Sequence, residues 1–208
     1  MELTMIEREI ASVLIEAMME YGLLECLNTD SELSAEDWFY HNKIHNFGFS
    51  GASGATKFCF SHPDLPGWVV KIGYDGLKHE YMEREYENYL AAKNYGLEHF
   101  FPVTAYVGEI RGYSCYAQQE VECCEEDIRS GWYEELRERF VMSGDEFEES
   151  DVWDEVDWLE DEERVNLLFH DEELIRFLRE RNINDLHEGN FGYIGRCAVI
   201  IDFSGWDG

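Results

Sequence analysis

The first regular pattern in the chain is helical. Between residues 5 and 27, apolar side chains recur at intervals of three and four residues, which places them on one face of an α-helix. The stripe consists of Ile6, Ile10, Val13, Leu14, Ala17, Met18, Tyr21 and Leu24. A second, short helix is predicted from Ser34, where Ser34 and Asp37 form an imperfect capping box. We expect residues 1–44 to be an N-terminal helical extension that either packs on the main domain or docks a partner.

The pattern then changes to short strand-like runs. The segment from Phe47 to Phe60 carries three glycines at three-residue spacing, Gly48, Gly51 and Gly54, between two such runs. Glycines let a backbone turn tightly and approach a ligand closely, which suits a hairpin that covers phosphates. An ordinary Gly-Ser hairpin shows the same pattern, so this segment alone leaves the two interpretations open.

A further strand is predicted from Trp68 to Ile72, and Lys71 interrupts its apolar run. A lysine in a strand usually extends its ammonium group to solvent. A functional Lys71 therefore requires a buried anionic partner or a phosphate.

A helix from Leu77 to Tyr95 follows, with Asp75 as its N-cap and Gly96 after its end. Tyr81, Leu90 and Ala91 are candidates for its packed side. The helix also carries Glu80, Glu83, Glu85 and Glu87, one of which can face Lys71. Two strands are predicted next, from Val103 to Val107 and from Tyr113 to Gln119, with a turn over residues 108–112.

In the last third, helical spacing returns over residues 124–140 and again from Glu163 to Arg181. Val165, Leu168, Leu174, Ile175 and Leu178 are the expected packed positions of the later helix. A hairpin is predicted after it, with strands at Phe191–Ile194 and Cys197–Ile201 around a Gly-Arg turn.

Three polar residues flank this hairpin. Asn190 precedes it, Asp202 follows it, and Asp185 lies five residues before Asn190. Because a hairpin brings its ends together, Asp202 is expected to return close to Asn190. Two such oxygen acceptors suit Mg²⁺, which keeps other positions for phosphate, and Asp185 would lie beside them as a base. The alternative is an acidic turn with no metal.

Composition changes this picture mainly through charge. The net charge of the 208-residue chain is −30, and 45% of its residues are hydrophobic, enough for a buried core. Such a surface repels nucleic acid and anionic membranes and favours basic partners or polyanion mimicry. No apolar run is long enough to span a membrane and no signal peptide is evident, so we expect a cytoplasmic protein.

Two local compositions bear on partners and metals. Residues 144–163 hold twelve acidic residues and no basic one, interleaved with aromatic residues. This segment suits either a solvated insertion or a site for a basic protein partner. The six cysteines are scattered, with Cys123 and Cys124 adjacent and no CxxC pair. This arrangement argues against a disulfide framework and against a zinc site.

The order of these features resembles that of the protein kinase-like fold, including the small-molecule phosphotransferases. The shared features are the glycine-rich hairpin, the strand with Lys71, the glutamate-bearing helix, the Asn-Asp-Leu-His-Glu-Gly-Asn run of residues 184–190, and the Asp-Phe pair at residues 202–203. The resemblance covers about residues 47–205 and is loose over 122–163. It implies an α+β, bilobal chain with residues 45–121 as an N-lobe and residues 122–208 as a reduced, mainly helical C-lobe. The N-lobe would hold a small antiparallel sheet and one helix.

The resemblance also implies roles, with ATP and Mg²⁺ as cofactors. Lys71 would contact the phosphates and pair with Glu85, for which Glu87 is the runner-up. Asp185 would be the catalytic base, and Asn190 and Asp202 the metal ligands. The loop over the phosphates and the adenine-reading hinge at residues 118–121 would bind the nucleotide through Gly48, Gly51, Ser53, Gly54, Gln119 and Val121.

Departures from the family pattern limit what is implied. Asn184 stands in place of the arginine usual before the catalytic aspartate, and Ser204 in place of the glycine usual after Asp-Phe. Only three residues follow Gly205, so an activation segment and later peptide-binding helices are not expected.

Two functional hypotheses follow. The first is an ATP- and Mg²⁺-dependent kinase-like phosphotransferase of minimal size, for which the set of Lys71, Glu85, Asp185, Asn190 and Asp202 argues. The second is an acidic pseudokinase or polyanion mimic that sequesters or inhibits a basic partner, for which the charge of −30 argues. A zinc protein built on Cys123, Cys124 and a distant histidine is the least favoured idea.

Overall fold

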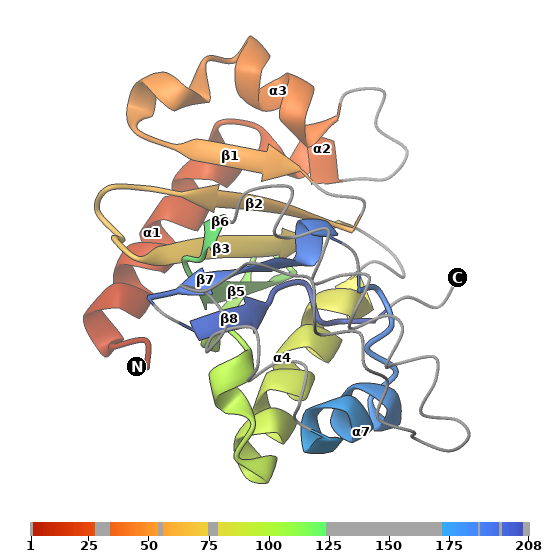
Figure 1. Ribbon diagram of the computed structural model, residues 1–208. Coiled ribbons are helices and arrows are strands. Elements are labelled where there is room, and N and C mark those ends of the chain that lie inside the picture. Colours follow the sequence, from red (N-terminus) through yellow and green to blue (C-terminus); the bar gives the residue numbers. More distant parts are fainter. Residues whose placement is uncertain are drawn as a thin grey trace, which may run out of the picture. The chain divides into compact units, whose positions relative to one another are not determined.

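The computed structural model describes residues 2–27, 34–53, 56–74, 79–123, 172–186, 188–195 and 197–205. These residues form an α+β structure, as expected (Figure 1). The chain divides into two compact units, residues 1–90 with 103–120 and residues 91–102 with 121–208. The predicted helix at 124–140, the acidic segment 144–163 and the first part of the helix from Glu163 lie outside the described residues.

The first unit is built on a five-stranded antiparallel sheet with the strand order β1-β2-β3-β5-β4. The bounds are β1 Ser50–Ser53, β2 Lys57–Ser61, β3 Trp68–Gly73, β4 Thr104–Ile110 and β5 Tyr113–Gln119. The strand with Lys71 and the strand from Tyr113 lie where they were predicted. The turn between β4 and β5 is shorter than predicted, because β4 continues to Ile110 after a bulge between Tyr106 and Gly108.

The two faces of this sheet have different coverings. Side chains alternate between the faces of a strand, and Phe58, Phe60, Val70 and Ile72 join the buried cluster formed with the N-terminal helices. The opposite face holds Lys57, Lys71, Tyr116 and Gln118 and meets helix α4 (His79–Tyr95). Glu85 of α4 accepts from Lys57, Lys71 and Gln118, and Tyr86 lies against Tyr116. The apolar face is therefore the core of the unit, and the polar face meets α4.

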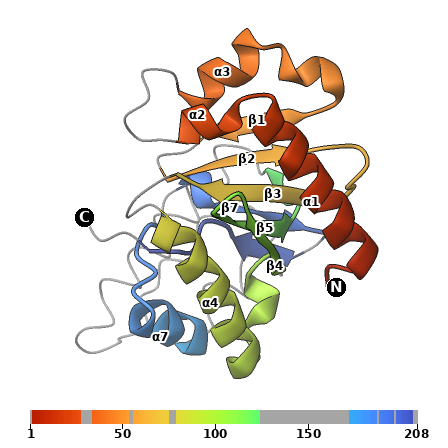
Figure 2. The same cartoon turned by 180° about the vertical axis from the view of Figure 1, so that it is seen from behind.

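The N-terminal helices belong to this core. Helix α1 (Met5–Glu20) begins at Thr4 with a capping box to Glu7 and packs along β4 (Figure 2). The single helix predicted over residues 5–27 is wrong, because it breaks at Tyr21 and Gly22. Gly22 has a φ of 103°, outside helical geometry, and α2 (Leu23–Leu27) starts after it. Of the two alternatives for the extension, the structure shows packing on the domain.

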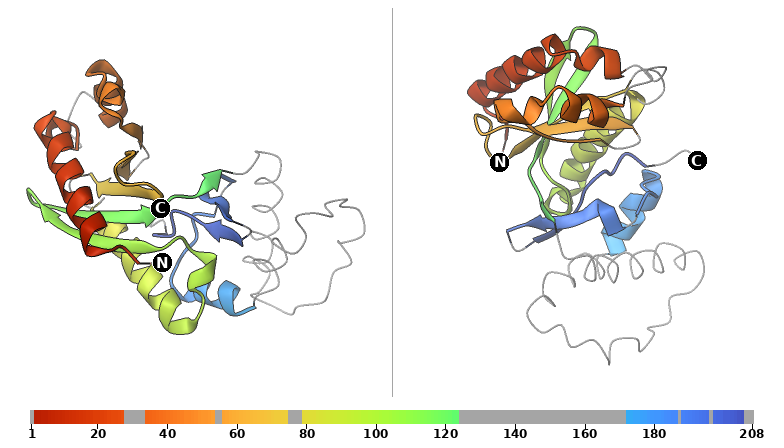
Figure 3. Two further views of the ribbon diagram at one scale, coloured as in Figure 1. Left: turned by 90° about the vertical axis from the view of Figure 1, so that its left-hand side faces the viewer. Right: turned by 90° about the horizontal axis from the view of Figure 1, so that it is seen from above.

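Helix α3 (Ala35–His41) confirms the prediction of a helix from Ser34. Ser34 Oγ accepts from the backbone N–H of Asp37 at 3.0 Å, as an N-cap should. The helix packs against β1 and is followed by the 3₁₀ turn η1 (Ile44–Phe47). Helix α3 and η1 together form a helical layer beside β1 (Figure 3).

Helix α4 is described over His79–Tyr95 and ends before Gly96, as predicted; its predicted start at Leu77 and cap at Asp75 lie outside the described residues. Its packed side differs from the prediction: Leu90 is 41% exposed, whereas Met82, Glu85, Tyr89 and Ala92 are buried. The buried side of α4 is centred on a charged residue, Glu85. The predicted apolar stripe through Tyr81, Leu90 and Ala91 therefore has its centre on a different side of the helix.

The second unit contains η3 (Glu98–Phe100), β6 (Glu122–Cys123), α7 (Glu172–Glu180), η5 (Glu188–Asn190), β7 (Phe191–Ile194) and β8 (Cys197–Ile200). The strands form a three-stranded antiparallel sheet in the order β6-β7-β8. The predicted hairpin is confirmed, with Phe191 opposite Ile200. Leu174, Ile175 and Leu178 of α7 are buried as predicted, together with Phe177.

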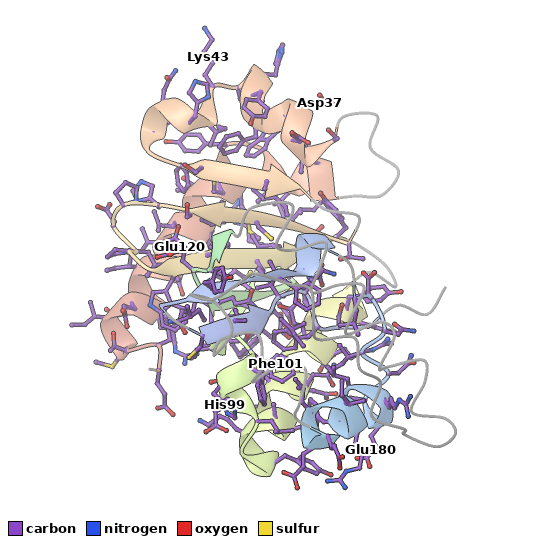
Figure 4. All side chains as sticks on the ribbon, in the orientation of Figure 1. Asp37, Lys43, His99, Phe101, Glu120 and Glu180 are labelled. Carbon is purple, nitrogen blue, oxygen red and sulfur yellow. The ribbon has the colours of Figure 1, made fainter. Side chains whose placement is uncertain are left out.

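An aromatic cluster forms the core of the second unit. Phe101, labelled in Figure 4, lies 5.8 Å from Phe177 and 4.8 Å from Phe203 between ring centroids. Phe203 is fully buried. The cluster therefore fixes the backbone that follows Asp202. Among the described helices of both units, none is long and apolar enough to cross a membrane.

Candidate functional site

The polar face of the first sheet carries a buried ion pair. Lys71 Nζ of β3 donates to Glu85 Oε1 of α4 at 2.6 Å. Lys71 is 6% exposed and Glu85 has no exposed surface. The partner expected for Lys71 is therefore present, and it is Glu85, whereas Glu87 lies on the exposed side of α4.

A second lysine shares the same carboxylate. Lys57 Nζ of β2 donates to Glu85 Oε2 at 2.8 Å, and Lys57 is 5% exposed. Lys57 was not among the predicted site residues. Its signal was weak, because Lys57 simply precedes the apolar run of β2, and only the register of β2 against β3 brings it near Lys71.

The hydrogen-bond network continues along the same face of the sheet to strands β5 and β4. Gln118 Nε2 of β5 donates to Glu85 Oε1 at 2.6 Å and approaches Thr104 Oγ1 of β4 at 3.1 Å. Gln118 and Thr104 are 3% and 2% exposed. Gln118 was expected in a hinge segment; its side chain instead belongs to the buried network around Glu85.

The electrostatics of this network favour the charged carboxylate. Burial alone would raise the pKa of the Glu85 carboxyl, but the charges and hydrogen bonds of Lys57 and Lys71 outweigh it and lower the pKa to about 2. Glu85 is therefore ionised at neutral pH. The network is a fixed negative group held by two cations.

The glycines of the predicted phosphate loop occupy different environments. Gly48 precedes β1, at the end of η1, and Gly51 lies inside β1 rather than in the turn. A Cβ on Gly51 would lie 2.9 Å from the Phe39 ring and 3.0 Å from the Phe58 ring. Packing against α3 therefore explains why residue 51 is glycine. Ser53 ends β1, and Gly54 lies outside the described residues.

The expected hinge residues lie on both sides of the point in the sequence where the first unit ends and the second continues. The backbone N–H of Gln119 donates to the Val103 carbonyl at 2.8 Å, and that of Glu120, labelled in Figure 4, donates to Gly67 at 2.9 Å. Both N–H groups are thus used within the first unit. Val121 belongs to the second unit, next to Gly192 of β7.

The second unit brings together the residues around its hairpin. Asn190 is 5% exposed, and its Nδ2 donates to the Asp185 carbonyl at 2.7 Å. The Ile201 N–H donates to the Asn190 carbonyl at 2.8 Å, so the residue before Asp202 is tied to Asn190. The hairpin therefore returns the chain as predicted. With Nδ2 engaged, Oδ1 is the atom of Asn190 that suits a metal ion.

Asp202 has a special backbone conformation. Its φ is 56°, in the left-handed region that residues other than glycine, asparagine and aspartate rarely adopt. Ser204 Oγ approaches Asp202 Oδ1 at 3.4 Å, and Phe203 on the other side is held in the aromatic core. Packing of Phe203 thus sets the position of the aspartate beside it.

Asn190 and Asp202 carry an amide oxygen and a carboxylate, the hard oxygen donors that Mg²⁺ binds. Among the described residues, no group of three or more His, Cys, Asp and Glu side chains could hold a metal ion. Mg²⁺ commonly takes only one or two protein oxygens and completes its shell with phosphate and water. An amide oxygen and a carboxylate meet that need. Cys124, invoked for zinc, lies outside the described residues.

Comparison of the chain with protein-family models, with curated proteins and with solved structures finds no match.

Proposed function

We propose that this chain is a kinase-like phosphotransferase with a reduced, bilobal protein kinase-like fold that uses ATP and Mg²⁺. The observation that carries the proposal is the buried pair of Lys71 and Glu85. A lysine placed on a sheet by a helix glutamate is suited to neutralise nucleotide phosphates. An ordinary strand lysine would extend to solvent, and this one does not.

Lys71 has the capacity for a second role while paired. An ammonium group has three N–H donors, and Glu85 Oε1 takes one at 2.6 Å. In the proposed site the other donors serve phosphate oxygens. Glu85 keeps the ammonium in place, so the cation needs no reorganisation when charge develops on the transferred group.

The remaining roles are proposed for residues of the second unit, described by that unit alone. Asp185 accepts the proton of the acceptor hydroxyl and orients it. Asn190, through Oδ1, and Asp202, through its carboxylate, hold Mg²⁺, which neutralises phosphate charge when bound. Their positions rest on the Asn190–Asp185 hydrogen bond and on the hairpin register. Positioning and charge neutralisation are what phosphoryl transfer chiefly asks of a protein.

The test is a thermal shift with ATP and Mg²⁺. At about a hundredfold excess over its dissociation constant, a ligand stabilises the folded state by about 2.7 kcal/mol, which corresponds to a Tm rise of about 5–10 °C for a chain of this size. We expect this rise in the wild type and its loss in Lys71→Ala and in Asp202→Asn. Each variant is compared with its own Tm without nucleotide, so a change in basal stability does not enter.

Matched controls are Lys93→Ala on the exposed side of α4 and Asp64→Asn on the surface. Both should keep the full ATP-dependent rise. Absence of any shift in the wild type at millimolar ATP would refute the proposal, and an unchanged shift in Lys71→Ala would refute the assigned role of the lysine.

The net charge of −30 favours a second candidate, an acidic pseudokinase or polyanion mimic that binds a basic partner. The same experiment separates the proposed function from pure polyanion mimicry. A protein that acts by mimicry alone shows no ATP-dependent rise, and its biological effect survives Asp185→Ala.

A further inference from the structure

The carboxylate of Glu85 accepts hydrogen bonds from three strands. Lys71 of β3 and Gln118 of β5 both donate to Oε1, at 2.6 Å each, whereas Lys57 of β2 donates to Oε2 at 2.8 Å. Lys57 thus occupies the oxygen that faces away from the Lys71 contact. Thr104 of β4 lies behind Gln118 at 3.1 Å. One side chain of α4 is therefore tied to β2, β3 and β5 directly and to β4 through Gln118.

The geometry of a carboxylate explains why the second lysine matters. The terminal torsion of a glutamate has a broad energy minimum, and each of its oxygens can accept more than one hydrogen bond. Without Lys57, the donors from Lys71 and Gln118 would both hold Oε1, and the restraint on Oε2 would be lost. A second cation on Oε2 supplies that restraint, because both oxygens are then held from different strands.

We propose that Lys57 is a positioning residue of the nucleotide site: by holding Oε2 of Glu85 it keeps Oε1 directed at Lys71, so that Lys71 is in place before nucleotide binds. The expected effect of Lys57 on nucleotide binding rests on the proposed function. The expected effect on the position of Lys71 concerns only Lys57, Glu85 and Lys71, and it can be measured without nucleotide.

The first experiment measures ATP binding with Mg²⁺ by isothermal titration calorimetry in wild type, Lys57→Met and Lys57→Arg, with Lys93→Met as a matched control. Removing Lys57 should raise Kd about tenfold, the effect of one charged hydrogen bond. Lys57→Arg, which keeps the charge, should restore Kd to within about threefold. Lys93→Met should bind as wild type. A Kd unchanged in a folded Lys57→Met would overturn the proposal.

A double-mutant cycle shows whether Lys57 acts through Glu85. In a Glu85→Gln background, Lys57→Met should produce no further loss of ATP affinity, because the group it positions is gone. A full tenfold loss in that background would mean that Lys57 contacts phosphate independently, which contradicts positioning.

The second experiment needs no nucleotide. In ¹⁵N-lysine-labelled protein, the order parameter of the Lys71 ammonium group should be high in wild type, fall in Lys57→Met and recover in Lys57→Arg. An equal order parameter in wild type and Lys57→Met would overturn the proposal even if ATP binds. If wild type does not bind ATP, the proposed function fails, and this measurement still decides the role of Lys57.

Discussion

At the scale of single residues, the Glu85 carboxylate shows how the interior of the first unit accepts charge. It has no exposed surface, and a carboxylate removed from water is stable only where cations and N–H donors replace the water. Lys57, Lys71 and Gln118 supply those donors. Removing any one of them leaves the buried Glu85 carboxylate with one donor fewer, so the network is expected to behave as a unit.

The lowered pKa of Glu85 predicts a specific pH dependence. A carboxyl whose pKa falls from 4.5 to about 2 on folding stabilises the protein above its unfolded pKa, and this contribution is lost as the pH falls through the folded pKa. The advantage of wild type over Glu85→Gln in the free energy of unfolding should therefore be constant above about pH 5 and shrink by roughly 3 kcal/mol toward pH 2. Urea unfolding at several pH values measures it.

Glu87→Gln is the matched control, because Glu87 lies on the exposed side of the same helix. Its pH profile should follow that of wild type. Parallel profiles of wild type and Glu85→Gln would contradict the ion-pair assignment.

At the scale of elements, the N-terminal helices and the sheet are joined by both packing and polar contacts. Trp68 Nε1 of β3 donates to Glu7 Oε1 of α1 at 3.1 Å, and Arg111 beside β4 pairs with Glu16 at 2.8 Å. Phe39 of α3 packs on Phe58 of β2, with ring centroids 6.1 Å apart. The helical extension therefore completes the core of the first unit.

Gly51 tests this element packing. In Gly51→Ala the new methyl group would approach the Phe39 and Phe58 rings to about 3 Å, and overpacking of this kind costs about 1–3 kcal/mol. We expect a loss of that size in urea unfolding. The exposed neighbour Ala52 offers the control, since Ala52→Val should change stability by less than about 0.5 kcal/mol. An unaffected Gly51→Ala would show that β1 and α3 are not in close contact.

At the scale of the whole molecule, charge repulsion opposes folding. With 46 acidic and 16 basic residues, the chain carries a net charge of −30, and self-repulsion of this kind destabilises a compact state. Salt screens it, because the Debye length falls from about 30 Å at 0.01 M to about 3 Å at 1 M ionic strength.

Raising NaCl over that range at pH 7 should therefore increase Tm by several degrees in calorimetry. The same titration near the pI of about 4.3, where the net charge is close to zero, is the control and should show little salt dependence. A Tm that falls with salt at pH 7 would indicate that attractive ion pairs, such as Arg111 with Glu16, outweigh the repulsion.

Much of the local structure was accessible from the sequence. The strand with Lys71, the helix that ends before Gly96, the cap at Ser34 and the Phe191 hairpin were all predicted, because each depends on periodicity, capping and turn residues within a short stretch. The break at Gly22 and the packed side of α4 were missed. Gly22 interrupts a run that is otherwise helical, and Glu85 is a charged residue on the buried side of α4.

For the candidate site, the sequence pointed to some residues, and the tertiary structure alone revealed the contacts between others. The sequence by itself identified the candidate residues: Lys71 in an apolar strand, glutamates on the next helix, and Asp185, Asn190 and Asp202 around a hairpin. Only the tertiary structure decided that Lys57 and Gln118 share Glu85 with Lys71 and that Gly51 faces Phe39. These contacts depend on the register between strands and on the helix that covers each face. Such long-range pairings leave no periodic signal within the segments that they join.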